Sequence, residues 1–174
     1  MDYFELFDLP HRFDVKSAQL SETFRKLQSA VHPDRFGAAS EQDKRIALQR
    51  SAHINDAYQT LKHPLSRAVY MLSTAGHDLK SEQKSFSDTA FLMQQMEFRE
   101  QLDDIKANQD MDSLLAMQSD VDAEITRYLA RIGEALDAPA KGDYADVADE
   151  VRRLKFFYKL NDELAELEDA LIDF

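Results

Sequence analysis

The chain has 174 residues, of which 44% are hydrophobic, and its formal net charge is -12. This composition supplies a hydrophobic core for one large or two small domains and excludes a disordered or fibrous chain. The absence of cysteine excludes disulfides, thiolate catalysis and thiolate metal ligands, and it suits a reducing compartment. Because only four glycines and four prolines punctuate the chain, we expect an all-α fold.

The first third of the chain predicts a helical hairpin with a short segment, Tyr3 to Leu9, packed across its base through Phe4 and Leu6. Apolar residues at helical spacing predict a helix over 17–31, and they are Leu20, Phe24, Leu27 and Val31. The following His32-Pro33-Asp34 should end this helix, because proline disfavours helical dihedral angles in the residue before it. A loop through Gly37 to Ser40 is expected next.

A second long helix is predicted to begin at Ser40, as N-cap with Asp43 three residues on, and to end at Lys62. Its apolar stripe consists of Ala47, Ile54, Tyr58 and Leu61. Pro64 should then open a short helix over 65–73, because proline is favoured in a first helical turn. Gly76 is expected to end this short helix.

Residues 77–86 are polar and without clear period, so we divide the chain into a module at 1–76, a connecting segment at 77–86 and a module at 87–174. The second module predicts a three-helix antiparallel bundle. Its helices should begin at Ser87 or Asp88, at Asp110 or Asp112, and at Asp143; the first should reach Asn108, and Pro139 and Gly142 should end the second. The predicted core stripes are Phe91, Phe98, Leu102 and Ile105; Leu114, Val121, Ile125, Tyr128 and Ile132; and Val147, Val151, Leu154, Tyr158, Leu160, Leu164, Leu167 and Leu171.

Charge is divided unevenly between the two halves. Residues 1–76 carry 10 Lys+Arg against 9 Asp+Glu, whereas residues 77–174 carry 11 against 24. Either two modules with different partners or a solvated acidic helix surface explains this division, and the acidic half disfavours nucleic-acid binding. No stretch is apolar over the ~20 residues that a membrane span needs, and the first residues lack an export-signal pattern. We therefore expect a cytoplasmic protein that does not bind membranes.

Several landmarks in the first module resemble those of J-domains. A His-Pro-Asp tripeptide lies in the loop between two amphipathic helices, with basic residues on the helix that leads into it. The opening Tyr3-Phe4-Glu5-Leu6-Phe7 and the segment Ile54-Asn55-Asp56-Ala57-Tyr58-Gln59-Thr60-Leu61 are also similar to J-domain sequences. The resemblance implies a co-chaperone that activates the ATPase of a DnaK-type chaperone.

The whole chain resembles the HscB-like family of J-proteins dedicated to iron–sulfur cluster assembly. The resembling segments are His32-Pro33-Asp34-Arg35-Phe36, Leu61-Lys62-His63-Pro64-Leu65-Ser66-Arg67-Ala68, Asp88-Thr89-Ala90-Phe91-Leu92-Met93 and Leu171-Ile172-Asp173-Phe174. This resemblance implies that the C-terminal bundle binds a cluster scaffold protein (IscU-like) and that the J-domain delivers it to a dedicated chaperone (HscA-like). One alternative is a general J-protein that serves a housekeeping DnaK, although the chain lacks a Gly/Phe-rich linker. Another is a helix-turn-helix DNA binder, which the acidic net charge of the chain disfavours.

Six residues are candidates for the chaperone contact: His32, Pro33, Asp34, Arg25, Lys26 and Arg35. Pro33 stiffens the turn, Asp34 accepts hydrogen bonds and His32 offers a ring donor and acceptor, while the cations would steer the module toward an acidic patch. The plainer interpretations are a helix stop with a capping Asp34 and a solvated face for Arg25 and Lys26. The chain supplies no nucleophile or phosphate loop beside His32, so we expect no enzymatic activity.

A second set of candidates lies on the bundle. Leu92, Met93 and Met96 fall outside the predicted core stripe of the first bundle helix, and carboxylates flank them. Phe156 lies off the stripe of the last helix, near Arg152 and Lys159, and is a candidate anchor. The predicted scaffold-binding residues are Leu92, Met93, Met96, Glu97, Glu100 and Phe156; packing against the first module or dimerisation is the alternative. The five histidines show no pair at i, i+4, so we expect neither a metal site nor a cofactor.

Overall fold

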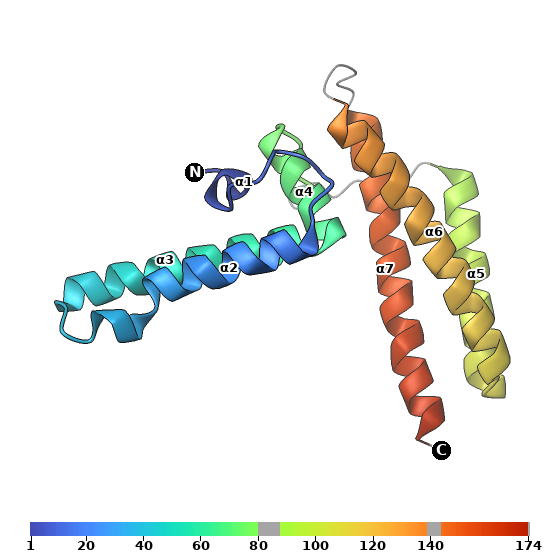
Figure 1. Ribbon diagram of the computed structural model, residues 1–174. Coiled ribbons are helices and arrows are strands. Elements are labelled where there is room, and N and C mark those ends of the chain that lie inside the picture. Colours follow the sequence, from blue (N-terminus) through green and yellow to red (C-terminus); the bar gives the residue numbers. More distant parts are fainter. Residues whose placement is uncertain (80–87, 139–143, 174) are drawn as a thin grey trace. The chain divides into compact units, whose positions relative to one another are not determined.

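The computed structural model describes residues 1–79, 88–138 and 144–173, with backbone alone at Pro33 and Phe36. All regular structure in these residues is helical, which confirms the predicted all-α class (Figure 1). The elements are α1 (Tyr3–Leu6), α2 (Ser17–Val31), the 3₁₀ helix η1 (Pro33–Phe36), α3 (Glu41–Lys62), α4 (Pro64–Thr74), α5 (Thr89–Asn108), α6 (Met111–Asp137) and α7 (Tyr144–Ile172). In the described part of the chain, no helix has the length and apolar character that crossing a membrane requires.

The chain forms two compact units, one of Met1–Gly76 with Gly133–Tyr144 and one of His77–Ile132 with Ala145–Phe174. The end of α6 therefore belongs to the first unit. The predicted caps Ser87 and Asp143, the helix-ending Pro139 and Gly142, most of the predicted connecting segment and the terminal Phe174 lie outside the described residues.

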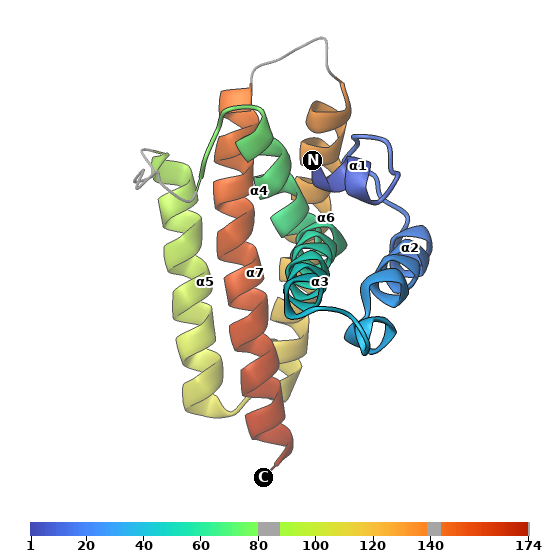
Figure 2. The same cartoon turned by 90° about the vertical axis from the view of Figure 1, so that its left-hand side faces the viewer.

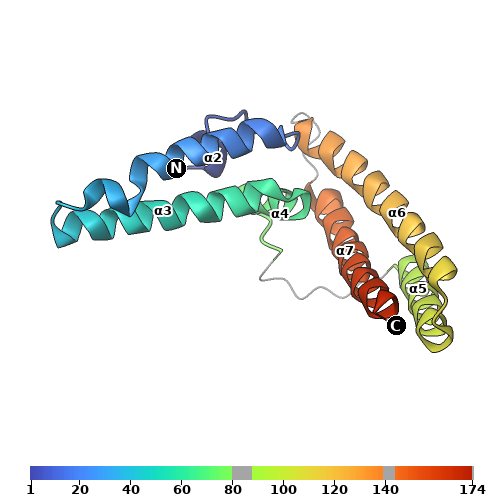
Figure 3. The ribbon, with the colours of Figure 1, turned by 60° about the horizontal axis from the view of Figure 1, so that its bottom comes forward.

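The first unit is built on a hairpin of α2 and α3, which run side by side (Figure 3). Phe24 of α2 stacks on Tyr58 of α3 with the ring centroids 4.0 Å apart. Further along, Gln28 and Ser51 form a reciprocal pair: the Gln28 amide donates to the Ser51 carbonyl at 3.1 Å, and the Ser51 hydroxyl donates to Gln28 at 2.8 Å. Ser40 caps α3 by accepting from the Asp43 N–H, as the sequence predicts.

At the base of the hairpin, α1 and α4 complete a small core. Phe4 is fully buried, as predicted, but Leu6 is only half-buried and Phe7 takes its place in the core. The reason is that α1 is a single turn, after which the chain bends at Phe7 and turns its ring inward. Tyr3 stacks on Tyr70 of α4 at 4.5 Å and donates its N–H to the Tyr70 hydroxyl at 2.9 Å.

The junction between α3 and α4 is held by side chains that form hydrogen bonds with backbone N–H and carbonyl groups. Pro64 is the first residue of α4, and His63 Nδ1 accepts the Leu65 N–H at 3.2 Å. The Ser66 hydroxyl donates to the Thr60 carbonyl at 2.7 Å. Arg67 is buried, and it donates from Nε to the Leu61 carbonyl at 2.9 Å and from Nη1 to the Phe13 carbonyl at 2.6 Å.

The last turn of α6 also packs within this unit, against the segment that precedes α2. The Phe13 N–H donates to Asp137 Oδ1 at 2.6 Å, and the Phe13 ring lies against Gly133. A Cβ atom at Gly133 would lie 2.9 Å from that ring, so a larger residue there would force the ring to move. Arg67 covers the same ring at 5.2 Å. The sequence pattern predicts none of these contacts, because the residues that form each of them lie more than 50 positions apart.

In the second unit, paired residues give the direction of each helix (Figure 1, Figure 2). Between α6 and α7 the residue numbers of bonded pairs change in opposite directions: Gln118 bonds Glu168 at 2.8 Å, whereas Arg131 bonds Glu150 at 3.1 Å. Between α5 and α7 the residue numbers of contacting pairs rise together: Phe91 contacts Phe156, and Arg99 contacts Glu163. Hence α6 is antiparallel to α7 and α5 is parallel to it, as in the predicted up-down-up bundle.

Two aspartates cap the bundle helices. Asp88 accepts from the N–H groups of Ala90 at 3.1 Å and Phe91 at 3.3 Å. Asp110 accepts from the Ser113 N–H and hydroxyl, and these bonds lower the pKa of its carboxyl group. Of the alternatives that the sequence leaves open, the structure therefore uses Asp88 at the start of α5 and Asp110 at the start of α6.

An aromatic residue that the sequence pattern missed fills the centre of the bundle. The predicted stripe of α7 passes through Tyr158, but Phe157 is the fully buried residue and Tyr158 is half-buried. Phe157 meets the rings of Phe98 at 5.8 Å and Tyr128 at 5.4 Å, so it contacts both neighbouring helices. Phe157 and Tyr158 lie three and four residues after Leu154, and both spacings keep a residue on the same helix face. Which of the two is buried depends on where the partner rings of the neighbouring helices lie.

Candidate functional site

The His-Pro-Asp tripeptide makes the turn between α2 and η1. α2 ends at Val31, and His32 adopts an extended conformation with φ -58° and ψ 134°. Pro33 then begins η1, and His32 Nδ1 accepts the Asp34 N–H at 3.3 Å. The side chain that caps this turn is therefore His32 rather than Asp34, contrary to the interpretation of Asp34 as a capping residue.

The carboxylate of Asp34 faces solvent. Its side chain is 91% exposed and approaches His32 Nδ1 at 3.5 Å. Nδ1 cannot accept the Asp34 N–H and also carry a proton for the carboxylate, so the capping arrangement requires the neutral ring with its proton on Nε2. In that state both the Nε2–H donor and the Asp34 carboxylate remain available to a partner, and His32 is itself exposed.

The predicted steering cations lie on α2 and η1, the two elements on either side of His32. Arg25, Lys26 and Arg35 are all exposed. Lys26 Nζ contacts Glu22 Oε1 at 3.0 Å, one helical turn away. The hydrogen bond and charge of Lys26, with a smaller contribution from Arg25, lower the pKa of the Glu22 carboxyl group. Glu22, which the sequence analysis missed, thus partly neutralises the positive patch in the free protein.

On the second unit, the apolar residues predicted to lie outside the core are exposed. Leu92 is 40% exposed, Met93 58% and Met96 63%. Leu92 and Met96 line a shallow hollow together with Phe156, and the charged residues around it are Arg99, Glu100 and Asp103. Four of the six predicted scaffold-binding residues therefore meet at one surface, which we call the α5 hollow: Leu92, Met96, Glu100 and Phe156.

Phe156 differs in two ways from the expectation of an exposed aromatic near Arg152 and Lys159. Its ring is half-buried, because its edge packs against Phe91 with centroids 5.8 Å apart. The cation over its ring is Arg99 of α5, at 5.7 Å, and Arg99 also pairs with Glu163. Arg152 instead pairs with Asp149 on its own helix. The sequence could not reveal Arg99, because its partners lie on another helix.

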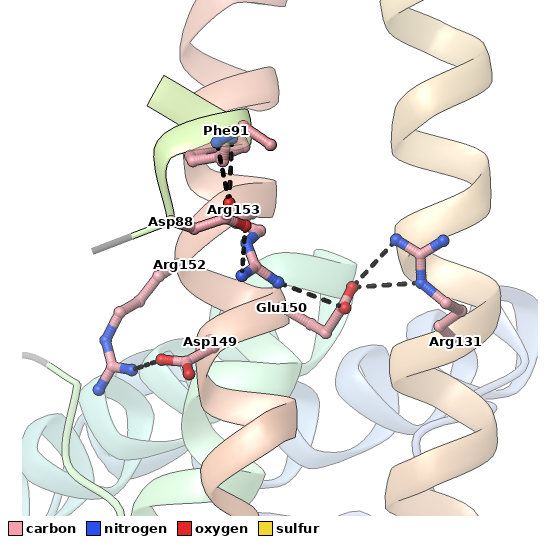
Figure 4. A network of polar contacts seen from close by, with 8 residues as sticks. Asp88, Phe91, Arg131, Asp149, Glu150, Arg152 and Arg153 are labelled. Atoms are coloured by element: carbon pink, nitrogen blue, oxygen red, sulfur yellow. Dashed lines mark hydrogen bonds and ion pairs between the residues drawn. The ribbon is translucent and has the colours of Figure 1, made fainter. Parts of the chain in front are cut away.

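Met93 and Glu97 line a different hollow, bounded by Phe91, Tyr128 and an ion-pair network. Arg153 reaches Asp88 at 3.0 Å and Glu150 at 3.6 Å, and Arg131 binds the same Glu150 (Figure 4). This network ties the capping residue of α5 to α7 and α6. The predicted scaffold-binding residues thus occupy two sides of α5 rather than one continuous patch.

No group of three or more histidine, aspartate or glutamate side chains within the described ranges is arranged to hold a metal ion. The two candidate sites are instead surfaces: an exposed polar turn with nearby cations on one unit, and an apolar surface flanked by charges on the other. Such features suit protein–protein contacts, because they offer directional polar groups and desolvatable apolar area without a reaction centre.

Comparisons with known proteins identify the family. Co-chaperone HscB homologues from Shewanella pealeana and Pseudoalteromonas atlantica are 47% and 49% identical to this chain, over 99% and 100% of it and the whole of each relative. The chain belongs to the HscB family. Residues 87–165 match the family model described as the HSCB C-terminal oligomerisation domain.

Solved structures agree with this assignment. The chaperone HscB from Vibrio cholerae is 44% identical, with a TM-score of 0.84 over 98% of this chain and 99% of that one. The human co-chaperone HscB is 27% identical, with a TM-score of 0.87 over 95% of this chain and 81% of that one. HscB proteins are J-domain co-chaperones of iron–sulfur cluster assembly, and this is the function of the chain. A general J-protein for unfolded clients is not favoured.

Proposed function

We propose that this HscB protein stimulates the ATPase of a dedicated DnaK-type chaperone (HscA-like) through residues 1–76 and presents to it an iron–sulfur scaffold protein (IscU-like) bound by residues 87–174. The observation that carries the first part is the Asp34 carboxylate, which is 91% exposed, while His32 and not Asp34 caps the turn. A cytoplasmic location stays a prediction.

The chaperone contact follows from the chemistry of the tripeptide. His32 keeps its turn in place through Nδ1 and presents Nε2–H outward, while the Asp34 carboxylate can accept charge-assisted hydrogen bonds from an arginine or from backbone N–H groups. Pro33 fixes the backbone between them, which limits the entropy lost on binding. Arg25, Lys26 and Arg35 would draw this surface toward an acidic patch on the chaperone.

The scaffold contact uses exposed apolar side chains beside carboxylates. Leu92 and Met96 project from α5 beside the half-buried Phe156, which its contacts hold in one orientation. An aromatic ring held in place is a good anchor, because little conformational entropy is lost when a partner covers it. Met93, Glu97 and Glu100 would extend the contact around α5, with the carboxylates facing basic groups of the scaffold.

Substitutions in the tripeptide test the chaperone contact. Asp34→Asn keeps the size of the side chain but removes its charge, and we expect loss of nearly all ATPase stimulation in single-turnover hydrolysis. His32→Gln should do the same. Calorimetric binding of the scaffold should stay unchanged for both variants. Thermal unfolding by circular dichroism should be unchanged for Asp34→Asn, whose carboxylate is exposed, and should fall slightly for His32→Gln, which loses the Nδ1 cap. Full stimulation by both variants would overturn the proposal.

Truncations on the bundle test the scaffold contact. Leu92→Ala and Met96→Ala should leave urea unfolding nearly unchanged but weaken scaffold binding, by about 2 kcal/mol where the side chain is a central anchor. Phe156→Ala should weaken binding and also cost some stability, since the ring packs on Phe91. The matched control is Leu102→Ala in the core, which should cost about 2 to 5 kcal/mol of stability. If Leu92→Ala and Met96→Ala destabilise like the control yet bind normally, the contact lies elsewhere.

A further inference from the structure

The distribution of sulfur in this protein is uneven. The chain contains six methionines and no cysteine, so its only sulfur atoms are thioethers. Met71 and Met117 lie in the cores of the two units, 4% and 3% exposed. Met93 and Met96, by contrast, are more than half exposed and lie one helical turn apart on α5. Met111, at the start of α6, is half-buried. Apart from the terminal Met1, the exposed methionines of the described chain are thus those on the proposed client surface.

The surroundings of Met96 and Met93 make a change of polarity there consequential. Met96 shares the α5 hollow with Leu92 and Phe156, where an apolar side chain adds contact area that a partner can desolvate. Met93 lies in the other hollow, beside Phe91 and Tyr128. Both positions are open to a small oxidant in the free protein, whereas a bound client would cover them.

We propose that Met93 and Met96 are sites of reversible oxidation by peroxide, and that their sulfoxides weaken binding of the scaffold. This inference rests on the proposed function, because it concerns regulation of the same client surface. A lone pair on the thioether sulfur attacks one peroxide oxygen, the O–O bond breaks and an S–O bond forms. Sulfur loses two electrons, and the other peroxide oxygen leaves as hydroxide, which takes the proton of the newly bound oxygen and becomes water.

The sulfoxide is a strong hydrogen-bond acceptor, unlike the thioether it replaces. Burying it against an apolar partner costs free energy unless a donor from the partner meets it, so the contact that methionine favours becomes unfavourable. The reaction is reversible, because stereospecific reductases return each sulfoxide epimer to the thioether and oxidise two thiols to a disulfide, with release of water. Since the protein has no cysteine, peroxide cannot change it through a thiol.

The test begins with the free, full-length protein treated with hydrogen peroxide, which is removed before any scaffold is added so that the scaffold's own thiols are spared. Peptide mass spectrometry should find oxygen added to Met93 and Met96 much sooner than to Met71 and Met117. Scaffold affinity by calorimetry should fall at least about tenfold, as expected for damage to a central anchor, while circular dichroism stays unchanged. Treatment with both sulfoxide reductases should restore the affinity.

The matched variant is Met93→Leu with Met96→Leu, which keeps apolar side chains of similar size but cannot form sulfoxides. Its affinity for the scaffold before treatment serves as its own reference, and this affinity should not fall after treatment. Failure of the untreated wild type to bind would refute the proposed function itself. Normal binding by protein oxidised at both positions, or an equal loss in the double variant, would instead refute only the inference about these methionines. Protection of both residues by bound scaffold would support it further.

Discussion

Two His-Pro turns in the first unit have the same local structure and different uses. In each, the histidine is extended, with ψ 134° at His32 and 130° at His63, and its Nδ1 accepts the N–H two residues on. In each, the proline opens a helix: Pro33 opens η1 and Pro64 opens α4. By its backbone alone, neither turn can be recognised as a binding site.

The difference lies in the residues that follow. After His63-Pro64, the Ser66 hydroxyl and the Arg67 guanidinium turn back to satisfy carbonyl groups of the core. After His32-Pro33, the side chains of Asp34 and Arg35 are exposed. Polar groups that satisfy the fold are structural, whereas polar groups held in place and left exposed are available to a partner. This contrast supports Asp34 as a contact residue better than the tripeptide motif alone does.

The largest expected effect comes from Arg67→Met on the structural side of this comparison. The substitution removes both donors and leaves the buried carbonyls of Leu61 and Phe13 without them. Because each unsatisfied buried acceptor costs about 1 to 3 kcal/mol, we expect a loss of about 3 kcal/mol in urea unfolding. The control, Arg35→Met after the other turn, should change stability by less than about 0.5 kcal/mol. Equal effects would erase the distinction between the turns.

A smaller effect on stability is expected when the histidine of each turn is replaced, and here the two turns should differ in function and not in stability. His32→Ala and His63→Ala each remove one capping acceptor, so each should cost about 1 kcal/mol in urea unfolding. Chaperone ATPase stimulation should nevertheless separate them: His32→Ala should lose most of it and His63→Ala should keep it. Comparable stimulation by the two folded variants would mean that His32 acts only as a cap.

Much of the fold could be predicted because its signals are local. α2 ends at Val31 and α5 begins directly after Asp88, as expected, since the proline after α2 and the aspartate before α5 act on neighbouring backbone groups. The sequence could not decide between Phe157 and Tyr158 for the bundle core, nor foresee that Gly133 packs on Phe13. These contacts depend on where another helix lies, and no local pattern encodes that position.

The candidate sites show the same limit. A helical wheel correctly predicts that Leu92, Met93 and Met96 are exposed, because the exposure of a residue on an amphipathic helix follows from its angle. It does not predict that Met93 lies in a different hollow from Met96, or that Arg99 covers Phe156. Those facts require the positions of α6 and α7 around α5.

The smallest expected effect concerns Glu22, which pairs with Lys26 on α2. Lys26 is therefore an exposed residue that is nevertheless partly satisfied within the fold, so it lies between the two classes of polar group compared above. Lys26 is exposed like Asp34, yet part of its charge is already satisfied within α2. Glu22→Gln should free that charge and speed association with the chaperone about twofold at low salt, with less gain at physiological ionic strength, where the screening length is about 8 Å. Stopped-flow association rates would measure it.

The matched control is Glu124→Gln on α6, which makes the same change in net charge where the carboxylate pairs with Arg127 in the second unit. It should leave the rate nearly unchanged if local charge near the tripeptide matters. The hydrogen bond and charge of Lys26 lower the pKa of the Glu22 carboxyl group, so this carboxylate is ionised at neutral pH. The gain from Glu22→Gln should therefore be constant between about pH 6 and 8, well above the ordinary carboxyl range. A gain that varied across that interval, or an equal gain from Glu124→Gln, would show that Glu22 does not limit access to Lys26.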